Sequence, residues 1–134
     1  MALTTEASAN PTADPARQAF QILRFGFTVA PILFGLDKFL NLLVNWEKYL
    51  APWIVHIVGN AHAFMLAVGI IEIIAGLLVA LKPRWGGYVV TLWLLGIIVN
   101  LLSYSGFYDI ALRDFGLLLA ALALGRLSEQ YGRA

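Results

Sequence analysis

The chain has 134 residues, of which 60% are hydrophobic and 13% are charged, whereas an ordinary soluble domain carries about a quarter charged residues. Its formal net charge of +1 provides no basic field for nucleic acid, and the lack of cysteine excludes disulfides, thiolate nucleophiles, iron–sulfur ligation and covalent c-type haem attachment. A soluble core of this size would be overfilled by several apolar stretches of bilayer length, so the composition predicts a membrane protein.

Residues 1–19 are rich in Ala, Thr, Ser and Pro and lack a cluster of large apolar side chains. We expect a disordered cytoplasmic tail here, with Pro11 and Pro15 opposing helix formation. The first apolar run begins at Phe20 and reaches the length of a full span, so it is expected to be a retained helix and not a signal peptide. Residues 20–134 then form one transmembrane domain.

Four apolar segments follow the tail, each near the ~20 residues that cross hydrocarbon. They cover residues 20–43, 61–81, 85–104 and 110–127. The short connections at 82–84 and 105–109 make consecutive helices antiparallel neighbours. Residues 45–58 are aromatic but too few to cross, which predicts a short helix in the membrane interface. The predicted fold is an all-α, up-down-up-down bundle of four membrane helices.

Basic residues are divided unevenly between the two sides of this bundle. One side carries Arg17, Arg24, Lys82, Arg84, Arg126 and Arg133, and the other carries Lys38, Lys48 and Arg113. The positive-inside rule therefore places both termini in the cytoplasm.

Charged residues inside the spans are informative, because each costs about 2.5–3.5 kcal/mol at a helix centre and should face protein, water or a partner. Arg24 and Lys38 lie on one stripe of the first span. Glu72 lies near the middle of the second span, with Gly69 and Gly76 on the same face. We predict that Arg24 reaches toward the bilayer centre and pairs with Glu72.

A second group of charges lies at the opposite end of the bundle. Asp37 and Lys38 end the first span, whereas Arg113 and Asp114 begin the fourth, so antiparallel threading predicts a four-charge cluster. With His62 it would form a polar pocket under the interfacial segment, completed by Asn100 or Ser103. The candidate binding residues are Asp37, Lys38, His62, Arg113 and Asp114. The alternative is that these charges only fix helix register by neutralising one another.

No residue pattern typical of catalysis occurs in the chain. Gly-rich phosphate loops, a nucleophilic serine with its base, and paired carboxylates at useful spacing are missing. His56 and His62 lack further ligand spacing around them, so we expect interfacial or hydrogen-bonding histidines and no metal site. We assign no catalytic residue and do not expect the chain to be an enzyme by itself.

Several segments together form a recognisable pattern: residues 34–39 (Phe-Gly-Leu-Asp-Lys-Phe), Asn45-Trp46, residues 49–52, Arg24, residues 72–78 and residues 111–119. In their order and spacing they resemble the DoxX family of small bacterial four-helix membrane proteins. The resemblance covers nearly everything after the tail. It implies the bacterial cytoplasmic membrane and a link to redox physiology, since some relatives of this kind are small subunits of quinone-reducing or other membrane oxidoreductase assemblies.

Three functions remain open at this point. The first is an accessory, non-catalytic subunit of a larger membrane redox complex, respiratory or otherwise. The second is a small oxidoreductase subunit that binds quinone or a lipid head group at the predicted four-charge cluster, with no covalent cofactor. The third is a small proton-coupled transporter in which an unpaired Glu72 carries the proton, a role that would require oligomerisation to provide a pathway.

Overall fold

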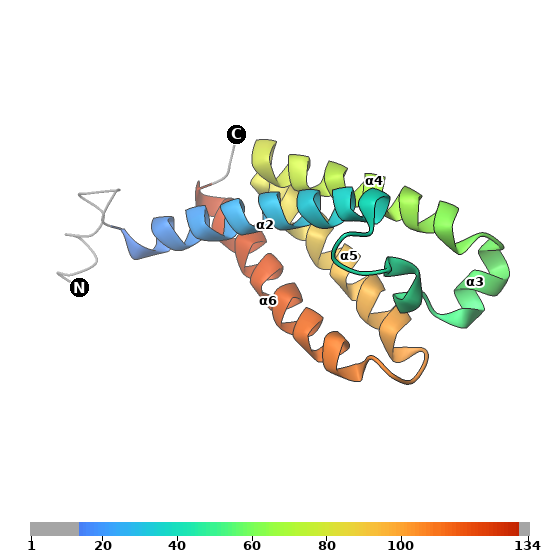
Figure 1. The fold of residues 1–134 in the computed structure, drawn as a ribbon. Helices are drawn as coiled ribbons and strands as arrows, with labels where there is room; N and C mark the ends of the chain where they lie inside the picture. The colour runs from blue at the N-terminus through green and yellow to red at the C-terminus, as the bar shows by residue number, and fades with distance from the viewer. Residues whose placement is uncertain (1–13, 132–134) are drawn as a thin grey trace.

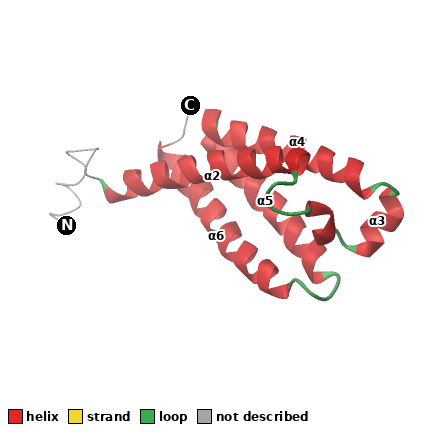
Figure 2. Cartoon of the chain, viewed as in Figure 1, coloured by secondary structure: helices red, strands yellow, loops and turns green. Residues whose placement is uncertain are grey.

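The computed structural model describes residues 14–131, and this part of the chain is all-helical (Figures 1 and 2). Its elements are α2 (Pro15–Leu40), the 3-10 helix η2 (Trp46–Tyr49), α3 (Pro52–Val58), α4 (Ala61–Leu81), α5 (Pro83–Leu102) and α6 (Tyr108–Tyr131). The predicted all-α class is confirmed. The second, third and fourth predicted segments correspond to α4, α5 and α6 within a few residues at each end.

Three helices, α2, α4 and α5, are long and apolar enough to cross a membrane. Helix α5, with 20 residues, measures about 30 Å at 1.5 Å per residue, which matches the hydrocarbon core. Helix α6 is longer but does not belong to this group, because Arg113 and Asp114 near its start and Arg126 near its end confine its uncharged stretch to residues 115–125. The chain thus has the features of a multi-pass membrane protein.

The start of α2 corrects the prediction of a tail up to residue 19. Helix α2 begins at Pro15, and the side chain of Asp14 caps it by accepting a hydrogen bond from the Ala16 amide at 3.1 Å. Proline at the first helical position removes only an N–H group that has no helical partner there, so Pro15 starts the helix and does not oppose it. The rest of the predicted tail, residues 1–13, lies outside the described residues.

Helix α2 packs antiparallel along α4, and glycines allow the two backbones to meet (Figure 1). A Cβ atom placed on Gly69 would lie 2.7 Å from the carbonyl oxygen of Gly35, and one on Gly76 would lie 2.8 Å from that of Thr28. Side chains larger than hydrogen would therefore force the helices apart. This is the close contact that small residues permit between membrane helices.

A second antiparallel pair is formed by α5 and α6, again through glycines. A Cβ on Gly87 would approach the Gly125 amide nitrogen to 2.7 Å. Helix α5 also meets α4 near the turn that joins them, where Gly86 lies against the Val79 backbone. The buried side chains of Val79, Val90 and Leu124 fill the space between these helices.

The chain between α2 and α4, residues 41–60, is called here the connecting segment. We expected one short interfacial helix, whereas the structure has two short elements, η2 and α3. Helix α2 ends at Leu40 because Asn41 adopts a left-handed conformation, with φ 52°. Pro52 then starts α3 as its first residue. The segment folds back over the helices in place of extending the first span to residue 43.

Replacing Gly86 with alanine tests the α4–α5 contact. The added Cβ would lie 2.5 Å from the Val79 Cα, so Gly86→Ala should reduce the free energy of unfolding by about 1–3 kcal/mol. Gly96→Ala is the matched control on the same helix, because nothing lies within 4 Å of its added Cβ. Unfolding by increasing SDS in mixed micelles measures both. Equal stability of the two variants would contradict the observed packing.

Candidate functional site

The central polar contact of the molecule is an ion pair between α2 and α4. The Lys38 ammonium lies 2.6 Å from the Glu72 carboxylate, and the two side chains are only 6% and 10% exposed. Gly69, one turn before Glu72, leaves room for the Lys38 side chain, because a Cβ there would lie 3.1 Å from the Lys38 Cβ. Two opposite charges therefore neutralise each other beside the close Gly35–Gly69 contact of the two helices.

An aromatic ring from the connecting segment covers this pair. The Lys38 ammonium lies 4.0 Å from the centre of the Trp46 ring, a geometry in which a cation is attracted to the ring face. The Trp46 indole N–H in turn donates to Asp37 Oδ2 at 2.7 Å. We call Lys38, Glu72, Trp46 and Asp37 the capped ion pair.

Asp37 also fixes the start of the connecting segment. Its buried carboxylate accepts hydrogen bonds from the backbone amides of Leu42, at 3.0 Å, and Leu43, at 3.2 Å. Three donors, two of them backbone amides, thus surround one carboxylate. Its negative charge is stabilised by hydrogen bonds and requires no basic partner on another helix.

The far end of α5 holds the middle of the connecting segment. The Asn100 side chain accepts from the Ala51 amide at 2.9 Å and donates to the Tyr49 carbonyl at 2.7 Å. The Tyr104 hydroxyl donates to the same carbonyl at 2.6 Å. Burial raises the pKa of the Tyr104 phenol, and the neighbouring Tyr49 raises it further, so the hydroxyl keeps its proton and remains a donor.

The predicted pair of Arg24 with Glu72 is wrong. Arg24 donates to the carbonyl oxygen of Ala80, while Glu72 pairs with Lys38. The physical reason is register: the antiparallel packing brings Arg24 beside Ala80, which lies eight residues beyond Glu72, or about 12 Å along the helix. That separation exceeds the reach of the guanidinium, whereas Lys38 lies directly opposite the carboxylate.

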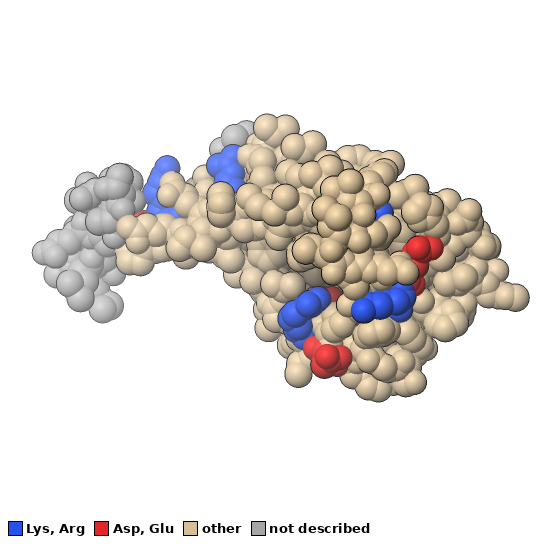
Figure 3. All heavy atoms as spheres, viewed as in Figure 1, with Lys and Arg blue, Asp and Glu red and all other residues tan. Residues whose placement is uncertain are grey.

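The predicted four-charge cluster is divided between separate partners. Arg113, with a side chain 67% exposed, bends to its own neighbour Asp114, with Nη2 3.2 Å from Oδ1. Asp37 and Lys38 are engaged within the capped ion pair. Within residues 14–131 no ion pair joins α2 to α6, and Figure 3 shows the charged side chains as small groups on a largely uncharged face.

His62 does not join these charges either. It is exposed, and its Nδ1 lies 3.8 Å from Oε2 of Glu47 in η2. Asn100 and Ser103, which we expected to complete a polar pocket, bind the connecting segment itself. In the described part of the chain, no group of three or more His, Cys, Asp or Glu side chains could hold a metal ion.

Sequence reasoning missed Trp46 as a member of the site. A tryptophan close to the predicted end of a span fits the interfacial belt equally well. The available signal was Lys38 itself, since a buried ammonium is stabilised by an aromatic face as well as by a carboxylate. Phe34, 5.6 Å away and edge-on to the Trp46 ring, helps to hold that ring in place.

Comparison with protein-family models, with curated proteins and with solved structures gave no match to this chain.

Removing one partner of the capped ion pair should destabilise the protein strongly. Lys38→Met or Glu72→Gln should each cost about 3–5 kcal/mol, because a buried charge loses its counter-charge. The double variant should cost much less than the sum. Arg84→Met is the control, since the Arg84–Glu129 pair is half-exposed and should contribute under about 1 kcal/mol. A double-mutant cycle measured by SDS unfolding that shows additive losses would contradict this pairing.

Proposed function

We propose that this chain is an accessory, non-catalytic subunit of a larger bacterial membrane redox complex, respiratory or of another electron-transfer type. The observation that carries the proposal is the capped ion pair. It neutralises the charges at the α2–α4 contact internally, with Lys38 and Glu72 joined at 2.6 Å. The helices therefore expose mainly apolar surface, which can pack against the helices of a partner.

The resemblance to the DoxX family supports the same proposal from the sequence side. Asp37 and Lys38 of the resembling segment 34–39, and Glu72 at the start of segment 72–78, all belong to the capped ion pair. Arg113 and Asp114, from segment 111–119, bind each other at the start of α6. The residues that carry the resemblance are thus used to hold the fold together, which suits a subunit whose role is architectural.

The other two functions receive less support. A proton-carrying Glu72 would have to release a Lys38 ammonium that lies against it in a buried position, at the cost of an unpaired charge. Quinone or lipid head-group binding at the predicted polar pocket would need Asp37, Lys38 and Asp114 to be available. Asp37 and Lys38 are engaged inside the protein, and Asp114 accepts from Arg113.

We further propose that α6 crosses the bilayer as a fourth span and that both termini lie in the cytoplasm. Its 24 residues extend about 36 Å, enough to cross. Arg113 and Arg126 can extend their charged ends toward the interfaces. The α5–α6 contact through Gly87 and Gly125 runs along both helices as between neighbours in a bundle.

Fusions to a periplasm-dependent reporter test this topology. Alkaline phosphatase should be active when fused in the α5–α6 turn at Gly106 and inactive when fused after Tyr131, because a fourth crossing returns the chain to the cytoplasm. A fluorescent protein that matures only in the cytoplasm should give the opposite result at the same two positions. Phosphatase activity after Tyr131 would show that α6 does not cross.

Native gels of mildly solubilised membranes test the accessory role. We expect the tagged chain to migrate with a larger complex that contains a redox enzyme, and we expect deletion of the chain to reduce the amount of that complex. Gly96→Ala, at an open position, is the control that should leave migration unchanged. Recovery of the chain alone, with every membrane oxidoreductase complex intact in its absence, would contradict the proposal.

A further inference from the structure

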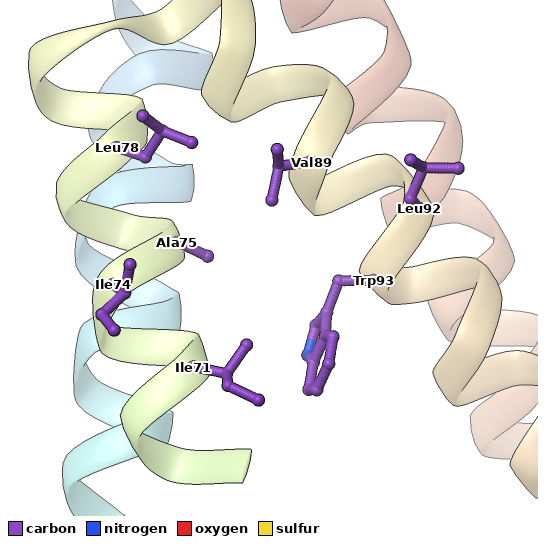
Figure 4. Close-up of a pocket in the computed structure, with 7 residues that line it drawn as sticks. All are labelled: Ile71, Ile74, Ala75, Leu78, Val89, Leu92 and Trp93. Atoms are coloured by element: carbon purple, nitrogen blue, oxygen red, sulfur yellow. The ribbon is translucent and has the colours of Figure 1, made fainter. Parts of the chain in front are cut away.

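A groove lies between α4 and α5 (Figure 4). Its volume is about 330 Å³, at the lower end of the range for small-molecule sites, about 300–1,000 Å³. The lining residues are Ile71, Ile74, Ala75, Leu78, Val89, Leu92 and Trp93. The lining contains no charged side chain, so a ligand held here would be uncharged in the part that enters the groove.

The groove exists because α4 and α5 touch closely at only one end. At the Gly86–Val79 contact the two backbones are in contact, while farther along the helices the side chains of Ile71 and Trp93 project into the space between them (Figure 4). Ala75 places only a methyl group on the α4 wall. Ile74 and Leu92, at the rim, are 59% and 69% exposed, which leaves the groove open to the surrounding lipid.

Trp93 introduces a polar atom into this apolar setting. Its indole nitrogen, Nε1, is buried and has no hydrogen-bond partner, the one such side-chain atom in residues 14–131. Trp93 is the eleventh residue of the 20-residue helix α5, about 15 Å from either end. Water is scarce at that depth of a bilayer, and an unsatisfied buried donor costs about 1–3 kcal/mol.

We propose that this groove binds a neutral, membrane-soluble ligand that carries a carbonyl oxygen, and that the Trp93 indole N–H donates to that oxygen. The uncharged lining selects a neutral molecule, and the unpartnered donor selects one with an acceptor. A phospholipid acyl chain has no acceptor at this depth, because its ester carbonyls lie near the interface. Figure 4 shows the indole ring of Trp93 between the two helices, with its nitrogen on the side toward α4. This inference is independent of the accessory role.

The indole N–H resonances of ¹⁵N-tryptophan-labelled protein in nanodiscs provide the test. Four tryptophans give four signals, and Trp93→Phe assigns one of them. The probe is laurone, a long-chain ketone with a central carbonyl, and the matched probe is tricosane, the alkane of equal length. Laurone should move the Trp93 signal downfield in a saturable manner, as hydrogen bonding requires. The signals of Trp46 and Trp53, already donors within the protein, should stay in place.

A groove-blocking variant separates binding from a general effect of the ketone on the bilayer. Val89→Phe adds bulk at a partly exposed position of the lining, and Val99→Phe adds the same bulk on α5 outside it. The first should weaken the laurone response at least tenfold, and the second should leave it unchanged. The proposal is overturned if laurone moves no indole signal, if tricosane produces the same shift, or if Val89→Phe responds as strongly as Val99→Phe.

Discussion

The ion pair between Lys38 and Glu72 is the constraint on which the arrangement of the other elements depends. Removing two charges from water costs several kcal/mol per ion, and their attraction offsets this only when the geometry is good. At 2.6 Å, and with the Trp46 ring against the ammonium, the geometry meets that condition. The pair also specifies one register of α2 against α4, because a shift by one helical turn would leave both charges unpartnered.

The orientation of the Lys38 side chain determines the orientation of the Asp37 side chain. Successive residues of an α-helix point about 100° apart, so when Lys38 faces α4, Asp37 must face elsewhere. It faces the connecting segment, where the Leu42 and Leu43 amides and the Trp46 indole donate to it. The same two residues therefore join α2 to α4 and fold the segment back over the pair, which explains why the chain turns at Asn41 and the helix does not extend to residue 43.

The sequence was sufficient for the all-helical class and for the bounds of α4, but not for the register of the helices. Apolar segments of span length predict membrane helices independently of tertiary contacts, and α4 matches its predicted bounds. Arg24 and Lys38 lie on one stripe of α2, so both could face Glu72. Only the position of one helix along the other selects between them, and the Gly35–Gly69 and Gly76–Thr28 contacts fit the same register as the ion pair. The composition of one segment does not encode the position of its helix along a neighbouring helix.

The two sides of α4 differ in whether their buried polar groups have partners. Toward α2, Glu72 has Lys38, and Lys38 has the Trp46 ring as well. Toward α5, the Trp93 nitrogen has no partner and faces walls of aliphatic carbon. A serine at position 75, 78 or 71 would place a hydroxyl oxygen, a hydrogen-bond acceptor, on the α4 side of the groove. Those positions are Ala75, Leu78 and Ile71, so the side chains at these positions offer Trp93 no acceptor, and the apolar walls define what kind of molecule could bring one.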